Sequence, residues 1–254
     1  MSSPIWTPDA LRSELKPYER RVWRVVEGQH LVSTRKIVDT NAEQRVLEEL
    51  VEASKPAIPE ECRGLDYLLS TPFRYRPGYP GSRFRRAGLT AGVFYAAEEP
   101  STAVAEMAFY RLLFFAESPR TPWPANPSDY TGFSAAVRTG RALDLTRPPL
   151  DADRGAWGDP IEYAACQALA DAAREAGGEI IRYESVRDPD GRASAAVLTC
   201  AAFAESYPLD YRTWRIGVGA GGAYALSDFP RVAIEFDRAA FAADPRIAGM
   251  VWER

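Results

Sequence analysis

The sequence predicts an α+β fold in which helices flank a mixed or split β-sheet. Short runs of β-branched and aromatic residues recur along the chain, and a few helical segments separate them without regular strand–helix alternation. The chain has 254 residues, of which 46% are hydrophobic and 26% charged, so it can bury a full core. We expect an N-terminal extension over residues 1–68 and one domain over residues 69–254.

The extension is expected to contribute a strand and a helix that pack on the core. The run VWRVVEGQHLVST (22–34) mixes strand formers with polar residues, and we expect it to pair onto the sheet. A helix should span about residues 42–54, because residues 39–41 (DTN) offer N-cap side chains and prolines follow at positions 56 and 59. The apolar stripe of this helix, expected to pack inward, consists of Val46, Leu47, Leu50 and Val51.

A strand followed by a helix is predicted in the middle of the chain. Residues 92–97 (GVFYAA) read as a short buried strand, and a helix should begin near Pro100 and run to residue 116. Its inward-facing residues are expected to be Ala103, Val104, Met107, Ala108, Leu112 and Phe115. Residues 118–132 contain four prolines and should form a loop at the rim of a cleft, followed by strands at 133–137 and 142–144.

The clearest helix start in the second half is Asp159-Pro160-Ile161-Glu162, which has the form of a capping box. This helix should run to residue 175 and end at the glycines 177–178. Strands are predicted over residues 179–186, 195–203, 214–218 and 232–236, with a tight turn at 188–191. Residues 217–222 match GxGxxG, but the chain breaks too soon afterwards for a dinucleotide-binding helix, so a hairpin or loop is expected.

Composition argues against several classes of function. The net charge of −4 argues against a general nucleic-acid binder, and no apolar run approaches the roughly 18 residues that span a bilayer. His30 is the single histidine and is expected to be a surface or strand residue, so no metal site or histidine-based triad is expected. Cys62, Cys166 and Cys200 show no CxxC spacing, which suits a reducing cytoplasm and predicts no disulfide framework.

The strongest functional signal lies between residues 71 and 106. Five arginines lie there among aromatic residues and glycines: Arg74, Arg76, Arg83, Arg85 and Arg86. Three interpretations are open: a solvated basic face, a nucleic-acid contact with interleaved aromatic rings, and a pyrophosphate pocket. Glycines at positions 78, 81 and 88 favour the pocket, because they let the backbone approach phosphate oxygens closely.

Three further residues are candidates for the same site. Glu106 lies amid apolar neighbours on the predicted helix, so it either pairs with an arginine or faces a cleft. Tyr95, in the short strand, is either a core residue or an aromatic wall for a planar ring. Ser185, at the end of a predicted strand, would ordinarily be a surface serine.

With these residues identified, the sequence resembles the RES-domain proteins, the toxins of RES–Xre type II toxin–antitoxin modules. That family is named for an arginine, a glutamate and a serine. The resemblance extends over roughly residues 69–236, and its motifs match Arg74–Tyr75, residues 81–84 (GSRF), Tyr95, residues 102–106 (TAVAE) and Ser185. Arg85 replaces the asparagine that is usual in the turn, and the spacing leaves open whether the first arginine is Arg74 or Arg83.

The resemblance implies a fold similar to ADP-ribosyltransferase toxins and an enzyme that consumes NAD without a metal. Arg74 and Arg83 would hold the pyrophosphate, while Tyr75 and Tyr95 would line the nicotinamide ring.

The resemblance also implies catalytic residues, namely Glu106, Arg83 and Ser185. Glu106 would stabilise an oxocarbenium-like transition state as nicotinamide leaves, and Ser185 would orient Glu106 or the ribose.

The partners implied by the resemblance are a protein target for ADP-ribose and an Xre-like antitoxin that covers the active site. Nucleic acid would be reached only through this antitoxin. Val104 stands where arginine-directed transferases have glutamate or glutamine, which argues against an arginine acceptor. Hydrolysis or phosphorolysis of NAD is the alternative to protein transfer, and a nucleic-acid-binding module is the alternative from another class.

Overall fold

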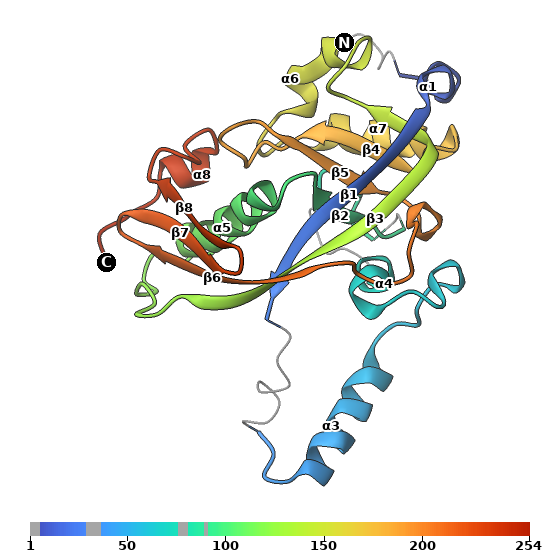
Figure 1. The fold of residues 1–254 in the computed structure, drawn as a ribbon. Helices are drawn as coiled ribbons and strands as arrows, with labels where there is room; N and C mark the ends of the chain where they lie inside the picture. Colours follow the sequence, from blue (N-terminus) through green and yellow to red (C-terminus); the bar gives the residue numbers. More distant parts are fainter. Residues whose placement is uncertain (1–5, 29–36, 76–80, 89–90) are drawn as a thin grey trace.

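The structure is a computed structural model that describes residues 6–28, 37–75, 81–88 and 91–254 (Figure 1). The predicted features His30, Arg76 and Gly78 lie outside these ranges. The helices are α1 (Pro8–Glu14), α3 (Asn41–Ser54), α4 (Tyr67–Arg74), α5 (Pro100–Glu117), α6 (Arg154–Trp157), α7 (Ala164–Glu175) and α8 (Pro245–Ala248). The strands are β1 (Lys16–Glu27), β2 (Phe94–Ala97), β3 (Ser128–Asp144), β4 (Ile180–Glu184), β5 (Ala193–Val197), β6 (Tyr211–Gly219), β7 (Gly222–Asp228) and β8 (Arg231–Asp237). The 3-10 turns in the described ranges are η1 (Glu60–Cys62), η2 (Leu150–Asp153) and η3 (Cys200–Ala202).

The eight strands of the described residues belong to one mixed sheet, which splits along β3. One edge of β3 pairs with β1 over most of its length, while the other edge pairs with β6 near its start and with β4 near its end. Between these two partners the chain around residues 203–210 bonds to β3, through a bridge from Phe203 to Val137. Only the β3–β4 pairing is parallel among the described strands. The predicted α+β fold with a mixed, split sheet and flanking helices is confirmed.

Five of the strands pair in a closed order. β1 pairs with β3 and also bridges to β2, while β2, β5, β4 and β3 are successive neighbours. Helix α5 packs beside β6, β7 and β8 in one core cluster, and α7 packs against β4 and β5 in another. A third cluster, which includes Phe94, Phe133 and Ile180, fills the space among the paired strands and α4. The split sheet therefore has two arms: α5 lies on the arm formed by β6, β7 and β8, and α7 lies on the arm formed by β4 and β5.

Helix α5 forms as the sequence predicts. Pro100 occupies its first turn, where a missing backbone N–H removes no helical hydrogen bond. The predicted inward-facing residues are buried or half-buried. The short strand before it is also confirmed as β2.

Helix α3 also forms, but its predicted packing is wrong. Thr40 and Glu43 make a full capping box at its start. The side chains of Val46 and Leu50, however, are 54% and 63% exposed, and Figure 1 shows the helix projecting away from the sheet. The contacts that tie α3 to the body include an ion pair between Glu52 and Arg74. Amphipathic spacing thus predicted the helix correctly but not what its apolar face contacts.

The strand expected within residues 22–34 is β1, which spans residues 16–27 and lies inside the sheet between β2 and β3. Residues 29–34 of the prediction lie outside the described residues. Residues 16–27 therefore belong to the same sheet as the rest of the chain. The boundary at residue 68 stays a prediction.

The helix predicted to begin at Asp159 begins at Ala164 instead. The Asp159 side chain accepts hydrogen bonds from the backbone N–H groups of Ile161 and Glu162, so the capping signal closes a turn. Backbone carbonyls at 157, 159 and 160 accept hydrogen bonds from arginine side chains, which keeps this segment out of the helix. The predicted end of the helix is confirmed: α7 ends at Glu175, and Gly177 after it has a φ of +83°.

Three strand predictions need smaller corrections. The segments predicted at 133–137 and 142–144 are one strand, β3, which begins at Ser128 and so includes the last residues of the loop predicted over 118–132. The segment predicted at 195–203 ends at Val197 and is followed by η3. The glycine-rich run at 217–222 is the β6–β7 hairpin, as expected.

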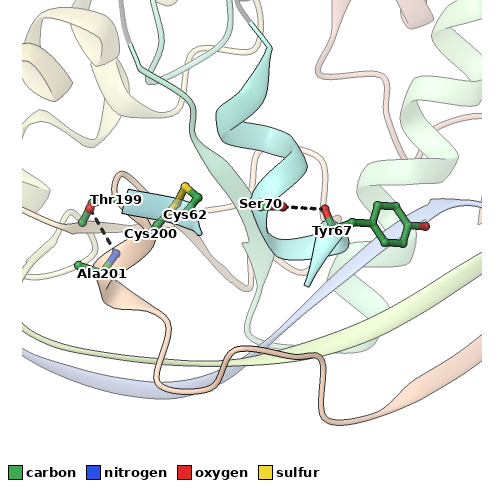
Figure 2. The surroundings of a disulfide bond; sticks show 6 residues. All are labelled: Cys62, Tyr67, Ser70, Thr199, Cys200 and Ala201. Atoms are coloured by element: carbon green, nitrogen blue, oxygen red, sulfur yellow. Dashed lines mark hydrogen bonds between the residues drawn. A yellow bond between two sulfur atoms is a disulfide. The ribbon is translucent and has the colours of Figure 1, made fainter. Parts of the chain in front are cut away.

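Two of the cysteines are joined, contrary to the prediction. Cys62 of η1 and Cys200 of η3 form a disulfide, with 5.4 Å between their Cα atoms (Figure 2). They lie 138 residues apart, so their spacing along the chain gave no signal of the pairing. Cys166 is a buried free thiol. Across the described ranges, no helix is both long and apolar enough to cross a lipid bilayer.

Candidate active site

A cavity of about 430 Å³ lies between α5 and the paired strands, within the usual size range of small-ligand sites. Four arginines line its described wall: Arg24, Arg83, Arg187 and Arg246. Four tyrosines also line it: Tyr95, Tyr110, Tyr163 and Tyr183. Glu106 is the one carboxylate among the described lining residues. No group of three or more His, Cys, Asp or Glu side chains in the described ranges is placed to hold a metal ion.

Glu106 reaches the cavity because of its place on α5. It shares a helix face with Ala103 and Tyr110, which also line the cavity. The Ser185 hydroxyl donates a hydrogen bond of 2.5 Å to Oε1 of Glu106. Burial raises the pKa of Glu106 above its ordinary value of 4.5, while the Ser185 hydrogen bond and the charges of Arg187 and Arg83 oppose this rise.

Ser185 is held behind Glu106 by the loop that follows β4. Its backbone N–H bonds to the carbonyl of Arg192, and its Oγ accepts a hydrogen bond of 3.3 Å from the backbone N–H of Arg187. The buried carboxylate of Asp188 accepts hydrogen bonds from Arg192 and from Thr102 at the start of α5. The loop that carries Ser185 and the helix that carries Glu106 are therefore tied together.

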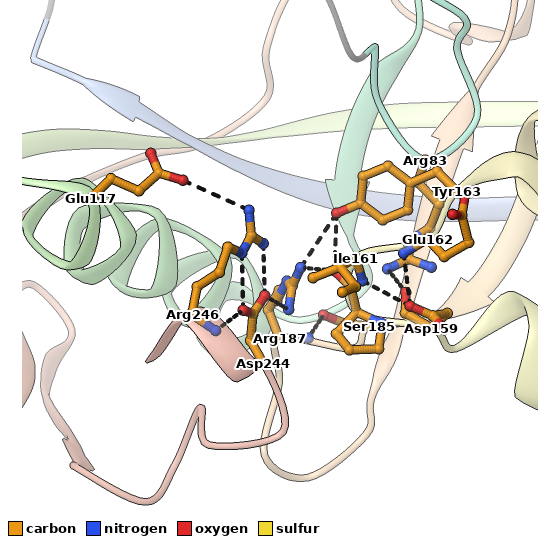
Figure 3. A network of polar contacts seen from close by, with 11 residues as sticks. Arg83, Glu117, Asp159, Ile161, Glu162, Tyr163, Ser185, Arg187, Asp244 and Arg246 are labelled. Atoms are coloured by element: carbon orange, nitrogen blue, oxygen red, sulfur yellow. Dashed lines mark hydrogen bonds and ion pairs between the residues drawn. The ribbon is translucent and has the colours of Figure 1, made fainter. Parts of the chain in front are cut away.

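Arg83 is buried in the cavity wall, with 7% of its surface exposed. Its guanidinium donates to the carbonyl oxygens of Trp157 at 2.6 Å and Asp159 at 2.9 Å. The guanidinium lies 4.9 Å from the ring centre of Tyr163, the N-cap residue of α7 (Figure 3). These contacts fix the charge of Arg83 at the wall and account for the irregular segment before α7.

A tight turn at residues 81–85 carries Arg83. Ser82 and Arg85 exchange two backbone hydrogen bonds across it, and the Tyr95 hydroxyl bonds to Ser82 Oγ and accepts from the N–H of Phe84. Gly81 has a φ of +89°, and a Cβ there would lie 2.5 Å from the carbonyl oxygen of Arg85. Tyr95 thus braces the turn with its hydroxyl, and burial raises the pKa of that phenol.

The other predicted binding residues lie away from this cavity. Arg74 donates to Glu52 Oε1 at 2.6 Å and to the carbonyl of Pro56. Tyr75 is 38% exposed, and its carbonyl accepts a hydrogen bond from Arg85. Neither residue lines the cavity. The structure therefore brings Arg83, Tyr95, Glu106 and Ser185 together, and it does not bring Arg74 or Tyr75 to them.

The remaining arginines of the 71–106 stretch do not form an open basic face in the described residues. Arg86 pairs with Asp171 at 2.6 Å, while Arg85 is buried and bonds to a backbone carbonyl. An exposed cationic surface is what the nucleic-acid alternative requires.

Sequence reasoning missed several lining residues, above all Arg24, Arg187 and Arg246. Arg187 lies two positions after Ser185, so its place next to a predicted site residue was a usable signal. Arg24 lies in the strand β1 and Arg246 in the C-terminal helix α8, far along the chain from the arginine-rich stretch. Only the tertiary fold brings these two residues to the cavity.

Comparison with known proteins identifies the family. The RES domain matches residues 58–217, which is more than half of the chain. No curated protein matches. Three chains of solved structures match, among them the crystal structure of the M. tuberculosis MbcT–MbcA toxin–antitoxin complex. That chain is 13% identical, with a TM-score of 0.46, and the match covers 80% of this chain and 91% of that one. By the extent of the family match, this chain belongs to the RES-domain family.

Proposed function

We propose that this chain is the toxin of a type II toxin–antitoxin system and that it cleaves the nicotinamide–ribose bond of NAD. The observation that supports this most directly is the shared cavity of Glu106 and Arg83, with Ser185 bonded to Glu106. Membership of the RES-domain family points in the same direction. In this proposal NAD is the substrate, and no metal takes part.

The reaction breaks the bond between C1′ of the ribose and the ring nitrogen of nicotinamide. The bonding electron pair leaves with nicotinamide, which becomes neutral, and positive charge develops on C1′ and the ring oxygen. The carboxylate of Glu106, fixed by Ser185 in a cavity of low dielectric, would stabilise that charge. An acceptor nucleophile then bonds to C1′ and releases its proton.

Arg83 and Tyr95 would bind the dinucleotide. Arg83 is already held by two backbone carbonyls, so its charge needs little reorganisation when phosphate arrives. The ring of Tyr95 offers an apolar wall to nicotinamide. We assign the role of the family's first arginine to Arg83, because Arg74 is engaged with Glu52. The contact of Tyr75 with nicotinamide stays a prediction.

The acceptor of ADP-ribose is proposed to be a protein, with water or phosphate as the alternative. Val104 is fully buried in the core, so no polar side chain occupies the position that arginine-directed transferases use. The proposed partner is an Xre-like antitoxin that covers the cavity in the cytoplasm. Incubation of cell protein with the enzyme and labelled NAD, followed by mass spectrometry, distinguishes the acceptors: a labelled protein indicates transfer, and free ADP-ribose or its phosphate indicates degradation.

The central test is release of nicotinamide from NAD by the purified toxin, measured by chromatography. Glu106→Gln should lower the rate by about 10²–10³, because a fixed group that stabilises transition-state charge contributes that much. Glu99→Gln, at the exposed start of the same helix, is the matched control and should retain activity. If the wild type and Glu106→Gln are equally inert towards NAD, the proposed function is wrong.

A further inference from the structure

The C-terminal segment beyond the family match contributes a cation to the cavity. Arg246, on the short helix α8, lines the cavity wall although the RES domain match ends at residue 217. Its side chain is 38% exposed, whereas Arg83 and Arg187 on the same wall are buried. Arg246 is therefore the more accessible guanidinium for a ligand that enters from solvent.

One buried carboxylate, Asp244, holds Arg246 in place (Figure 3). Asp244 is 1% exposed and accepts hydrogen bonds from Nε of Arg246 at 3.0 Å and from Nη2 at 2.7 Å. These two bonds occupy one edge of the guanidinium. Nη1 is left with a long contact of 3.9 Å to the exposed Glu117.

The same carboxylate holds a second arginine of the cavity wall. Oδ2 of Asp244 accepts a hydrogen bond of 2.9 Å from Arg187, whose guanidinium also bonds to the carbonyl of Pro160. Arg187 packs 3.8 Å from the ring centre of Phe109. Asp244 thus bonds to both the buried Arg187 and the more exposed Arg246.

Charge at this wall suits a doubly negative ligand. Four guanidinium groups line the cavity, and Glu106 is the one carboxylate among its described lining residues, while Asp244 and the exposed Glu117 contact Arg246 from outside the lining, so the wall itself carries an excess of positive charge. A diphosphate diester carries two negative charges. Guanidinium groups bind phosphate oxygens through paired N–H donors in a fixed plane, and a plane already fixed by Asp244 loses little freedom on binding.

We propose that Arg246 binds the diphosphate of the substrate and that Asp244 is a positioning residue that orients both Arg246 and Arg187. The identity of the substrate as NAD rests on the proposed function above, but binding of a nucleoside diphosphate at Arg246 does not. The C-terminal segment is then part of the site and not only a cover for the sheet.

The test is binding of ADP to the full chain, measured by calorimetry, together with steady-state kinetics on NAD. Arg246→Gln keeps a donor for Asp244 and removes the charge, so ADP affinity should fall by about 10- to 100-fold. KM for NAD should rise by a similar factor, with kcat within about twofold of the wild type, because ground-state and transition-state binding are weakened alike. Arg238→Gln, an exposed arginine of the same segment that lies off the cavity, is the matched control and should change neither value.

Two further variants protect the test against misfolding. Arg246→Lys keeps the charge and should restore part of the lost affinity for ADP. Asp244→Asn should weaken ADP binding and also lower the melting temperature, because it leaves Arg187 buried without its carboxylate.

The inference is overturned if Arg246→Gln binds ADP as tightly as Arg238→Gln, or if the wild type binds no ADP at millimolar concentration. Binding that depends on Arg246 in a protein that leaves NAD intact would support the inference while the proposed function fails. If Arg246→Gln cleaves NAD with the same KM and kcat as the wild type, the proposed function is supported and the inference about Arg246 fails.

Discussion

At the scale of single residues, Glu106 is under two opposing influences. Burial disfavours its charged form, while the Ser185 hydroxyl and two nearby arginines favour it, and burial is the larger effect on its pKa. A carboxylate that must stabilise developing positive charge works best in such surroundings, although the fold loses stability by burying it. Stability and activity should therefore respond in opposite directions to its replacement.

The stability of the protein should depend on pH through this residue. Since the pKa of Glu106 is raised in the folded state, its ionisation opposes folding, and the loss of stability grows as pH rises from about 4.5 through the raised pKa. Glu106→Gln should therefore melt at a higher temperature than the wild type at pH 8 and at an equal temperature near pH 4. At this chain length each 1 kcal/mol corresponds to about 2–4 °C.

Thermal melts between pH 4 and pH 8 check this expectation, with Glu99→Gln as the control. A variant that melts below the wild type at every pH would show that the Ser185–Glu106 hydrogen bond outweighs the effect of burial.

The sequence allowed some of these residues to be predicted and not others, for a physical reason. Glu106 was identifiable because a carboxylate in an apolar helix face is a local anomaly. Arg83 was identifiable from the glycines around it. Arg246 and Arg24 are ordinary arginines in their own segments, and they reach the cavity only because the fold brings α8 and β1 to its wall.

At the scale of elements, the turn at residues 81–85 sets the position of Arg83. Helix α7 supports this turn from outside, since Gln167 donates to the carbonyl of Ser82. Tyr95 supports it from the strand β2. Helix α5 was predictable because its apolar residues recur at helical spacing. The start of α7 was not, because the backbone carbonyls of Asp159 and Pro160 accept hydrogen bonds from arginine side chains that are distant in the sequence.

Gly81→Ala should disrupt this turn more than an equivalent change nearby. A Cβ at Gly81 would meet the Arg85 carbonyl at 2.5 Å and strain a φ of +89°, so the loss should be about 2–4 kcal/mol, with a marked fall in NAD turnover. Gly88 also has a positive φ, of +67°, but has no atom within 4 Å of a Cβ. Gly88→Ala should therefore cost only about 1 kcal/mol.

Denaturant unfolding of both variants, with NAD turnover measured in parallel, tests the role of the turn. Equal effects at the two glycines would mean that the close approach of Arg85 relaxes without consequence.

At the scale of the whole molecule, β3 holds the two arms of the split sheet together. The arms meet where the chain around residues 203–210 bonds to β3, close after η3. The disulfide from Cys62 joins this region to η1 and so to the start of α4. The pairing was unpredictable from spacing because it depends on how the arms close, which is a property of the entire fold.

Under non-reducing conditions, the double variant Cys62→Ser/Cys200→Ser should be less stable than the wild type by about 2–4 kcal/mol, since the bond restricts a long loop of the unfolded chain. The melting temperature of the wild type should fall on addition of a reductant, while that of the double variant should not change. A thiol count on the unfolded, unreduced wild type should give one free thiol, that of Cys166. Three free thiols, together with a wild-type melting temperature that does not change on addition of reductant, would show that the two cysteines lie side by side without a bond. The sheet and its core alone would then hold the two arms together.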